Sequence, residues 1–579
     1  MMSRCKIYYG GEQYEISFTE AGSLLELVRG AGLPVSAPCG GNGTCGKCKV
    51  TAIGALSPLA QEELDKLTKE EIAEHVRLAC CAKPMGDVEI RLFDTASAQI
   101  LDDFYQNSDE PLSPVLKISE VTLPAPGLIG KNADCYRLAD ALNVPVCFTV
   151  NALRELSCLK GETVQTVSYQ NQIISITEPA NPVYAAAVDI GTTTVCIYIV
   201  DVIQQKIIDK CTRLNEQSPF GADVISRIGA SSQPENLQKM RELLIGQINE
   251  MTRGYPLSLI TFAGNTTMLH TLLGVNPEHI AAAPFNPVFT HGFSCPASEL
   301  GLQLNSGCMA HILPGLASYV GADITAGILA CGMMDSESYS LLIDIGTNGE
   351  IALGNSGKIL CCGTAAGPAF EGAKIACGCG AVSGAVNTIR WDSDSFSITT
   401  IGNLPAIGIC GSAIIDAAAF LSDTGLIDET GRFDEEYEGP FAANVFEMNG
   451  QPAFRLTESV YVTQQDIREI QLAKAAIAAG IATLLNNAGL SFEQIGTLYL
   501  AGGFGNYINR NNAAAIGLIP PELKEKLIPA GNASASGAAL CILSESAVQR
   551  LPGIVQAAEY IELSASPVFQ QQYMEQMYF

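Results

Sequence analysis

The sequence predicts an α/β protein of several domains, and three observations support this prediction. The chain has 579 residues, of which 47% are hydrophobic, which is enough apolar material for about three or four separate cores. Four cysteines gather near the N-terminus, three of them in one glycine-rich loop. Further along, an apolar strand that ends in Asp-Ile-Gly-Thr occurs twice, which indicates two related α/β lobes.

The N-terminal stretch has the pattern of a small sheet with one helix. Alternating polarity predicts strands over 6–9 and 14–18, joined as a hairpin. A helix is expected next, because Ser23 and Glu26 form the Ser-x-x-Glu pattern of a capping box. Residues 87–92 alternate again and predict a half-buried strand.

The cysteine loop has the spacing of an iron–sulfur site. Cys39, Cys45 and Cys48 follow C-x5-C-x2-C, and Cys80 stands alone downstream. A loop that wraps a small inorganic core needs positive φ angles and close approach of backbone N–H groups to sulfur, which its glycines allow. We therefore predict that Cys39, Cys45, Cys48 and Cys80 bind a [2Fe–2S] cluster, and that the protein transfers electrons.

Two alternatives bear on this site. Cys45 and Cys48 alone also fit a zinc knuckle, but zinc ribbons pair two such knuckles, whereas here three thiols share one loop. Cys81 follows Cys80 directly, so either thiol could be the fourth ligand. We favour the cluster over zinc, and Cys80 over Cys81.

Residues 1–94 resemble a β-grasp ferredoxin. The expected order is strand, strand, helix, cluster loop, strand, helix and strand, and the C-x5-C spacing is more similar to adrenodoxin-type than to plant-type ferredoxins. Residues 95–115 are acidic, contain two prolines and lack lysine and arginine, which predicts a flexible linker. Residues 116–182 are expected to form a small α/β middle domain, with helices and strands over 132–142, 151–156, 163–169 and 172–177.

The repeated turn is the second strong signal. Residues 189–193 read Asp-Ile-Gly-Thr-Thr and residues 344–348 read Asp-Ile-Gly-Thr-Asn, each after an apolar strand. A tight turn between strands exposes N–H groups and hydroxyls to phosphate oxygens, while the Asp faces the accompanying metal. A third glycine turn, Gly502 and Gly503, follows another strand and leaves room for an adenine ring. A long core helix is expected over 463–488.

In this order the three turns resemble the phosphate-1, phosphate-2 and adenosine motifs of the acetate and sugar kinase, Hsp70 and actin superfamily. The resemblance spans residues 184 to about 545 and implies duplicated ribonuclease-H-like lobes around Mg2+ and ATP, so we expect residues 183–579 to form the ATP-binding domain. It implies that Asp189 and Asp344 hold the metal. The residues implied to contact the nucleotide are Gly191, Thr192, Thr193, Gly346, Thr347, Asn348, Gly502 and Gly503.

A [2Fe–2S] ferredoxin ahead of such an ATPase resembles the reductive activators of corrinoid-dependent methyltransferases. Residues 264–268, 365–372 and 531–533 are similar to that family as well. The resemblance implies an ATP-hydrolysing enzyme that passes one electron to an inactive cobalt(II) corrinoid on a partner protein and returns it to cobalt(I). It also implies a low-potential electron donor and a homodimer formed through the ATPase domain.

Two further residues are singled out as hypotheses. Thr364 lies in a loop of small residues, 363–368, that could approach the partner's corrinoid closely; a role in packing or beside the phosphates is equally compatible with the sequence. Glu350 follows Asp344 on the same turn and is a candidate for orienting the attacking water, with Glu371 as the weaker alternative.

Composition excludes some classes of function. The net charge of −27 argues against nucleic-acid binding, which needs a basic face. No run of 18 apolar residues and no signal peptide is evident, so we expect no membrane span and a cytoplasmic location. The competing functions are an ATP-coupled activator of another low-potential enzyme, such as a radical dehydratase, a small-molecule kinase with a redox-regulatory ferredoxin, and a redox scaffold without ATPase activity.

Overall fold

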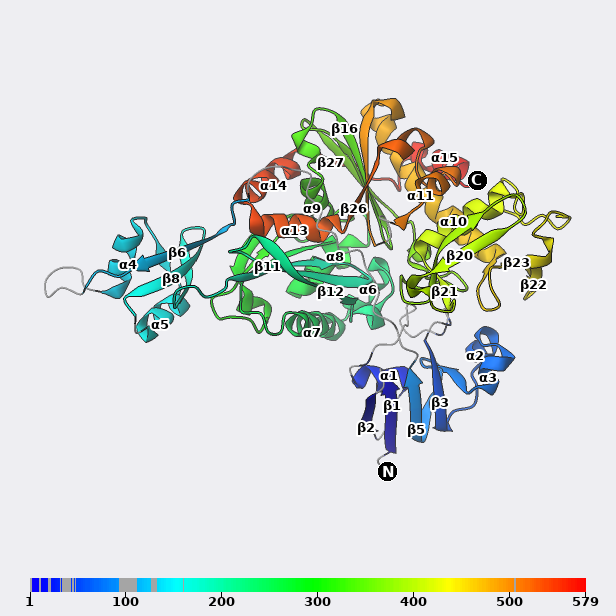
Figure 1. Ribbon diagram of the computed structural model, residues 1–579, viewed down its shortest axis with the longest axis horizontal. Coiled ribbons are helices and arrows are strands. Elements are labelled where there is room, and N and C mark those ends of the chain that lie inside the picture. Colours follow the sequence, from blue (N-terminus) through cyan, green and yellow to red (C-terminus); the bar gives the residue numbers. More distant parts are fainter. Residues whose placement is uncertain are drawn as a thin grey trace.

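The structure is a computed structural model. It describes residues 3–9, 12–18, 22–31, 33, 43, 46, 48–92, 112–125, 133–159, 161–503 and 507–579. Cys39 and Cys45 therefore lie outside the described residues, as does most of the expected linker. Figure 1 shows three parts: the N-terminal domain below, a small sheet at one side, and a large two-lobed body.

The N-terminal domain is one mixed sheet in the order β2-β1-β5-β3-β4. The expected hairpin is present, and β5 alternates between buried and exposed residues as expected. Ser23 caps the first helix by accepting from the N–H of Glu26 at 3.3 Å, whereas the Glu26 carboxylate accepts from Gly22 instead of Ser23. The elements are β1 Ser3–Tyr9, β2 Glu12–Phe18, α1 Leu24–Gly30, β3 Lys49–Leu56, α2 Gln61–Lys66, α3 Lys69–Ala73, β4 Val76–Leu78 and β5 Pro84–Leu92.

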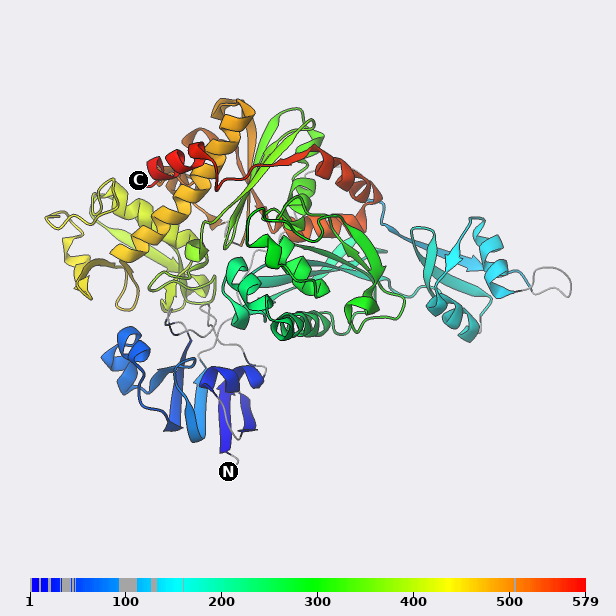
Figure 2. The same cartoon turned by 180° about the vertical axis from the view of Figure 1, so that it is seen from behind.

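A second, four-stranded sheet, in the order β6-β8-β9-β7, projects from the body like an arm (Figures 1 and 2). Just before β6 the chain is fastened to the body, because the N–H of Val115 donates to the Ile542 carbonyl and the N–H of Glu545 donates to the Ser113 carbonyl. The last residues of the expected linker are thus held in place. The elements are β6 Leu116–Thr122, α4 Asp134–Leu142, β7 Cys147–Phe148, α5 Val150–Cys158, β8 Thr163–Tyr169 and β9 Gln172–Thr177.

The body consists of two lobes with the same topology. Each has three antiparallel strands followed by two parallel ones, so that the order across the sheet is third, second, first, fourth and fifth. The first lobe contains β10 Tyr184–Ile190, β11 Thr194–Asp201, β12 Lys206–Leu214, β13 Leu257–Gly264 and β15 Met309–Ile312, with β14 Phe293–Pro296 at the edge. The second contains β16 Tyr339–Ile345, β17 Gly349–Gly354, β18 Ile359–Thr364, β25 Ile495–Ala501 and β26 Leu527–Gly531, with β27 Ala558–Tyr560 at the edge.

Two helices cross between the lobes. α9 (Ala322–Ala330) leaves the first lobe and packs on β16 and β17 of the second, while α13 (Ala533–Leu543) leaves the second lobe and packs on β10 and β13 of the first. Figure 1 shows α13 lying between the two sheets. Both helices are rich in small and aliphatic residues, and nearly every side chain in them is buried. The lobes therefore share one continuous core at this crossing.

The remaining helices cover the outer faces of the lobes. The expected long helix is α11, capped as expected: the N–H of Asp466 donates to the Thr463 hydroxyl, and the N–H of Thr463 donates to the Asp466 carboxylate. No helix among the described residues combines the length and apolarity needed to cross a bilayer. The other helices of the body are α6 Val224–Ser231, α7 Pro234–Met251, α8 Thr266–Leu273, α10 Gly411–Asp423, α11 Gln464–Ala488, α12 Arg510–Ala515, α14 Glu545–Ala557 and α15 Pro567–Glu575.

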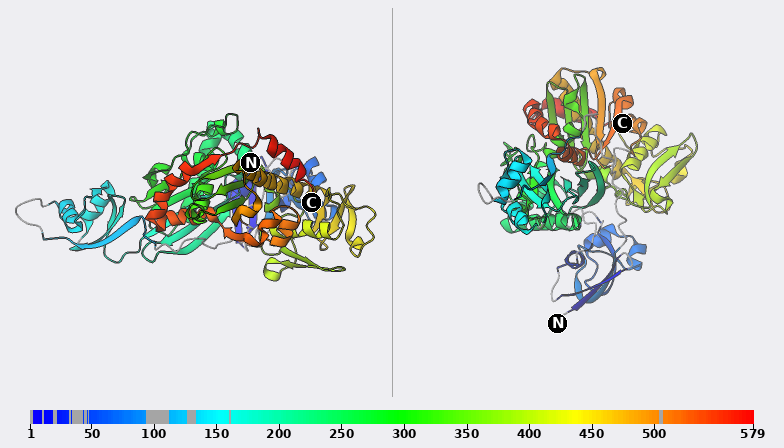
Figure 3. Two further views of the ribbon diagram at one scale, coloured as in Figure 1. Left: turned by 90° about the horizontal axis from the view of Figure 1, so that it is seen from above. Right: turned by 60° about the vertical axis from the view of Figure 1, so that its left-hand side comes forward.

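Two small sheets extend the second lobe toward the N-terminal domain and the solvent. Their strands follow the orders β20-β19-β21 and β22-β23-β24. The N-terminal domain lies beneath the lobes in Figures 1 and 2 and in the right-hand view of Figure 3, and Figure 1 shows it on the side of α6 and β21. The bounds are β19 Ala385–Trp391, β20 Phe396–Thr400, β21 Gly408–Ile409, β22 Val445–Met448, β23 Gln451–Arg455 and β24 Tyr461–Thr463.

Candidate nucleotide and cluster sites

The two repeated turns occupy equivalent places in the two lobes. The first turn, 191–193, joins β10 to β11, and the second turn, 346–348, joins β16 to β17. The N–H of Gly191 donates to the Thr194 carbonyl at 2.9 Å, and the N–H of Gly346 donates to the Asn348 carbonyl at 2.9 Å. A Cβ at Gly191 would lie 2.8 Å from the Thr194 oxygen, so the first turn requires glycine.

The structure brings the two turns into direct contact. The hydroxyl oxygens of Thr193 and Thr347 are 3.0 Å apart, and both hydroxyls lie 2.9 Å from the Glu371 carboxylate, to which they can donate. Glu371 ends a short 3-10 helix, Pro368–Glu371, beyond β18. A single carboxylate thus ties together hydroxyls from opposite lobes, at the place where the sequence predicts nucleotide phosphates.

Asp189 is held by the beginning of the crossing helix α13. The Ser534 hydroxyl donates to one carboxylate oxygen at 2.7 Å, and the Asn532 amide donates to the other at 2.9 Å. Burial raises the pKa of Asp189, and these two donors oppose that rise. Asn532 also caps α13 by accepting from the N–H of Ala535 at 2.7 Å, so the side chain that orients Asp189 is itself fixed.

Asp344 has a different environment. It pairs directly with Glu350 across β16 and β17, which places both side chains on one face of the sheet. Burial, followed by the negative charges of Asp323, Asp189 and Glu371, raises the pKa of Asp344 to about 8. Burial and then Asp189 raise the pKa of Asp323, in the first turn of α9, to about 7. The pKa of Glu350 is raised well above its usual range by burial and by Asp323 and Asp344.

Five carboxyl groups therefore converge on the interlobe site: Asp189, Asp323, Asp344, Glu350 and Glu371. Within the described part of the chain, none of them forms an ion pair with lysine or arginine. So many carboxyls without a cation stay protonated or need a metal ion. In those same residues no three such side chains are placed to hold an ion by themselves.

Two asparagines complete the site. Asn265 caps α8 by accepting from the N–H of Met268 at 2.9 Å, and it donates to the Thr192 hydroxyl at 3.0 Å. Asn265 and Asn532 both follow a strand-ending glycine and begin a helix. Sequence reasoning noticed both stretches but gave these residues no role. Their shared Gly-Asn pattern at a strand-to-helix junction is the signal that could have identified them.

The third glycine turn packs against the second lobe's first strand. Gly502 has φ 106°, and a Cβ there would lie 2.3 Å from the Ile345 carbonyl oxygen, so only glycine fits. A Cβ on Gly503 would meet no atom within 4 Å. Open space thus begins at Gly503, next to the end of β16. Residues 504–506 of this turn lie outside the described residues.

Thr364 is the last residue of β18, and its side chain is only 3% exposed. Its hydroxyl donates to the Gly349 carbonyl at 3.0 Å, so it links β18 to β17. The loop that follows lines a cleft of about 1980 Å³ that extends from the second turn to the N-terminal domain. The Thr364 hydroxyl is therefore occupied within the sheet, and residues 363–368 line the cleft mainly through their backbone.

At the expected cluster site, the structure describes two of the four predicted ligands, Cys48 and Cys80, and the alternative fourth ligand, Cys81. The sulfurs of Cys48 and Cys80 are 3.2 Å apart, and those of Cys80 and Cys81 are 3.6 Å apart. Two thiolates bound to one tetrahedral metal lie about 3.8 Å apart for bonds of ~2.3 Å. Both separations are close to this value, so they place Cys48 and Cys80 together but do not choose between Cys80 and Cys81 as the fourth ligand. Burial raises the pKa of Cys81, with Cys48 and two glutamates adding to the rise.

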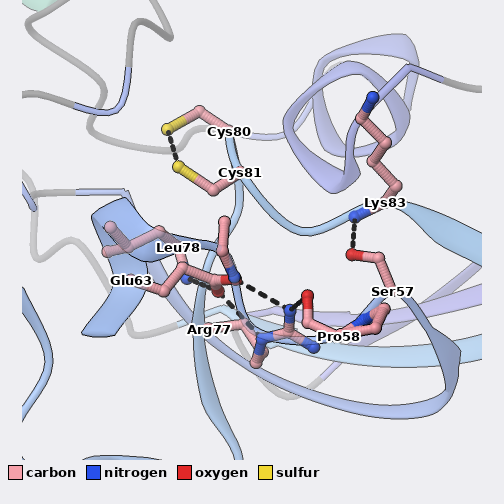
Figure 4. A network of polar contacts seen from close by, with 9 residues as sticks. Ser57, Pro58, Glu63, Arg77, Leu78, Cys80, Cys81 and Lys83 are labelled. Atoms are coloured by element: carbon pink, nitrogen blue, oxygen red, sulfur yellow. Dashed lines mark hydrogen bonds and ion pairs between the residues drawn. The ribbon is translucent and has the colours of Figure 1, made fainter. Parts of the chain in front are cut away.

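A buried ion pair supports the strand that leads to Cys80 (Figure 4). Glu63 is fully buried and accepts from two nitrogens of Arg77, each at 2.8 Å. The same carboxylate accepts from the N–H of Leu78 and of Ala60, each at 3.0 Å. All four acceptor directions are used, which offsets the cost of burying the charges. The network fixes β4 two residues before Cys80.

Fold and site together define a class: an iron–sulfur electron-transfer protein joined to a two-lobed ATP-binding domain. Residues 7–85 match the 2Fe-2S iron-sulfur cluster binding domain. Residues 184–336 match the RACo middle region, and residues 338–579 match the C-terminal domain of RACo, the ASKHA domain. The region called middle in that family is thus the first lobe and not the projecting sheet.

Similar proteins narrow the class. The corrinoid activation enzyme RamQ of Eubacterium limosum is 31% identical, over 97% of this chain and 96% of its own. The [Co(II) methylated amine-specific corrinoid protein] reductase of Methanosarcina barkeri is 25% identical, over 65% of this chain and 73% of its own. A solved structure of a reductive activator for corrinoid, iron-sulfur protein is 31% identical, covers 99% of this chain and 98% of its own, and superposes with a TM-score of 0.76. The chain belongs to the family of reductive activators of corrinoid proteins.

Proposed function

We propose that this protein, acting in the cytoplasm, uses ATP to reduce an inactive cobalt(II) corrinoid on a partner protein to cobalt(I) by one electron. The observation that supports this most directly is the joining, in one chain, of closely spaced cluster thiols and an interlobe site where two phosphate-binding turns meet. The relatives named above act on corrinoid proteins, and one of them is named for the cobalt(II) state.

The need for ATP follows from redox potentials. Plant-type [2Fe–2S] centres work near about −400 mV. Because the cobalt(II)/cobalt(I) couple is expected to lie lower, each ~59 mV of difference disfavours a one-electron transfer ten-fold. Closure of two lobes around a nucleotide is a two-state change that can favour the conformation in which transfer occurs.

In the nucleotide site, we assign Asp189 and Asp344 to Mg2+, and the two turns to the phosphates. Glu350 faces the same side of the sheet as Asp344, which suits it to orient the attacking water. Glu371 is occupied by two threonine hydroxyls, and we assign it to holding the turns together. Gly502 and Gly503 border the space assigned to adenosine.

For the cluster we assign Cys39, Cys45, Cys48 and Cys80. When bound, the cluster supplies the electron that the partner receives. Cys80→Ser should lower the iron content and abolish the visible spectrum of the oxidised cluster, whereas Cys81→Ser should retain both. The opposite result would make Cys81 the fourth ligand.

The loop 363–368 borders the same cleft as the N-terminal domain, and we propose that it faces the partner's corrinoid. Widening the strand end by Thr364→Phe should slow corrinoid reduction. Because the Thr364 hydroxyl also links two strands, Thr364→Val is the matched control, and it should keep most of the activity. Reduction that proceeds unchanged in Thr364→Phe would contradict this assignment.

The main experiment mixes anaerobic protein, a strong chemical reductant, Mg-ATP and a cobalt(II) corrinoid protein, and follows the cobalt(I) absorption band. The band should form only with ATP, and Asp189→Asn should prevent it while leaving the cluster spectrum intact. Formation of cobalt(I) without ATP would contradict the coupling. A homodimer through the ATPase domain and a low-potential electron donor are further parts of the proposal, and sedimentation analysis of the purified protein tests the first.

A further inference from the structure

One segment, residues 215–227, holds the back of the first turn. The Asn215 amide donates to the Gly191 carbonyl at 2.8 Å, and the Asn215 N–H donates to the Thr193 carbonyl at 2.8 Å. The Arg227 guanidinium donates to the carbonyl of Thr192. All three carbonyls of the first turn are therefore bound by this single segment, while the hydroxyls of Thr192 and Thr193 are turned to other partners, Asn265 and Glu371.

Arg227 is a buried charge whose described partners are all neutral. Its side chain is 1% exposed, and it contacts the Gly221 carbonyl at 3.0 Å, the Gln217 side-chain oxygen at 3.4 Å and the Met268 sulfur at 3.2 Å. No carboxylate in the described ranges forms an ion pair with it. Burial lowers the pKa of Arg227 to about 10, so it stays protonated at neutral pH.

A buried charge without a counter-ion is costly, unless an opposite charge arrives when the protein functions. The negative charge of Asp223, in the same segment, opposes the fall in the pKa of Arg227 but forms no ion pair with it in the described ranges. The front of the first turn, where the anionic phosphates of a nucleotide are expected, is a place for a further negative charge. The second turn lacks this arrangement: among the described side chains, none donates to its three carbonyls. The guanidinium is therefore a feature of the first lobe alone.

The segment is rigid on its inner side. The N–H of Gln217 donates to the Asn215 side-chain oxygen at 2.9 Å, and the Gln217 amide donates to the Met240 carbonyl at 3.1 Å. Asn215 and Gln217 are fully buried, and Asp223 caps α6 by accepting from the N–H of Ser226 at 2.8 Å. A displacement of the first turn is thus passed directly to the start of α6.

The outer side of the segment forms a wall of the large cleft. Residues 219–226 line it, and Ile225 is 52% exposed there. The same cleft is lined from the N-terminal domain by Gly46, Lys49 and Lys66, which belong to or adjoin the cluster loop. One face of residues 215–227 therefore contacts the first turn, and the other face lines the cleft opposite the N-terminal domain.

We propose that segment 215–227 transmits the presence of nucleotide phosphate at the first turn to the cleft wall beside the ferredoxin domain, with Arg227 as the positioning residue. The inference rests on the nucleotide site proposed above. The ligand it senses is an anionic phosphate, and its output is the position of residues 219–226. When ATP binds at the first turn, the resulting movement of residues 219–226 would change the shape of the cleft beside the ferredoxin domain.

Calorimetric titration with Mg-ATP tests the first half. Arg227→Met should weaken binding by about ten-fold or more, as expected for losing a hydrogen bond from a charged group. The matched control is Arg241→Met, which removes an arginine of the same lobe that donates only to the Leu300 carbonyl at 2.9 Å; its affinity should stay within about two-fold of wild type. Equal effects of the two substitutions would overturn the inference.

Amide hydrogen exchange tests the second half. Saturating Mg-ATP should slow exchange across 219–226 in the wild type, and this response should be lost in Arg227→Met while residues 346–348 still respond. Asn215→Asp, which keeps the acceptor for the Gln217 N–H, is a second variant with the same expected loss should Arg227→Met fold poorly. An unchanged response of 219–226 overturns this inference alone, whereas a wild type that does not bind Mg-ATP overturns the proposed nucleotide site as well.

Discussion

The two lobes share one topology but surround their aspartates with opposite chemistry. In the first lobe, Asp189 accepts from Ser534, the second residue of α13. In the second lobe, Asp344 feels the negative charge of Asp323, the second residue of α9. Burial raises the pKa of both aspartates, but hydrogen-bond donors oppose the rise at Asp189, whereas neighbouring carboxylates add to it at Asp344. The two lobes thus have the same backbone arrangement, but the second residue of the crossing helix differs: Ser534 lies beside Asp189, and Asp323 lies near Asp344.

Removing either aspartate should give the largest effect and should separate activity from stability. Asp189→Asn and Asp344→Asn should each lower Mg-dependent ATP hydrolysis on the order of 10²–10³-fold, a loss comparable to that of other electrostatic groups in active sites. Without ligands at pH 8, Asp344→Asn should raise the melting temperature because it removes a repelled charge, whereas Asp189→Asn should lower it because its amide would face that of Asn532. Equal stability changes would break the comparison.

The stability of the ligand-free protein should fall as pH rises. Asp323 and Asp344 have folded-state pKa values of about 7 and about 8, against 3.8 as the ordinary value. Above pH 4 the unfolded chain releases protons that the folded protein retains, so stability declines between about pH 4 and pH 8 and then levels off. Thermal unfolding across this range should show the decline as a melting temperature that falls with rising pH. Mg-ATP should abolish most of it, and a flat profile without ligand would contradict the raised values.

Asp323→Ser makes the second lobe resemble the first. Because a charge that raises the pKa of Asp344 is removed, the acid limb of the ATPase pH profile should move to lower pH by about one unit. The unchanged basic limb serves as the internal control. An acid limb that does not move would mean that Asp323 and Asp344 do not interact in the working enzyme.

Ser534→Ala should have the smallest effect. It removes one of two donors to Asp189, and a hydrogen bond to a charged group contributes about 1.5 kcal/mol or more, so ATP hydrolysis should fall about ten-fold. Steady-state assays at saturating Mg2+ measure this. A drop as large as that of Asp189→Asn would show that Ser534 does more than orient the carboxylate.

Local pattern made much of the fold predictable. The strands over 163–169 and 172–177 have the expected bounds, since alternation and turn residues are local signals. The two turns were predictable for the same reason, because glycine and aspartate stand together in the sequence. The placement of Glu350 opposite Asp344 follows once the turn is known.

The rest of the site is assembled by long-range topology. Asp323, Asn215 and Arg227 carry no motif in their own surroundings, and they reach the turns only because α9 crosses to the other lobe and 215–227 folds back behind β10. For Thr364 the sequence left a packing role and a corrinoid-facing loop open, and only the pairing of β18 with β17 reveals that its hydroxyl is buried. Contacts between the lobes join residues that are far apart in the sequence, so no local sequence pattern predicts them.

The contact of residues 113–115 with the end of α13 and the start of α14 links two distant parts of the molecule. The stretch that leads away from the ferredoxin domain is bound through Val115 to the C-terminal end of α13 and through Ser113 to the first residue of α14. The N-terminal end of α13 holds Asp189. The helix has 11 residues, so about 16 Å separate its two ends. One helix thus connects Asp189 with the point at which the chain before β6 is fastened to the body. A shift of α13 along its axis would therefore displace that attachment point together with Asp189.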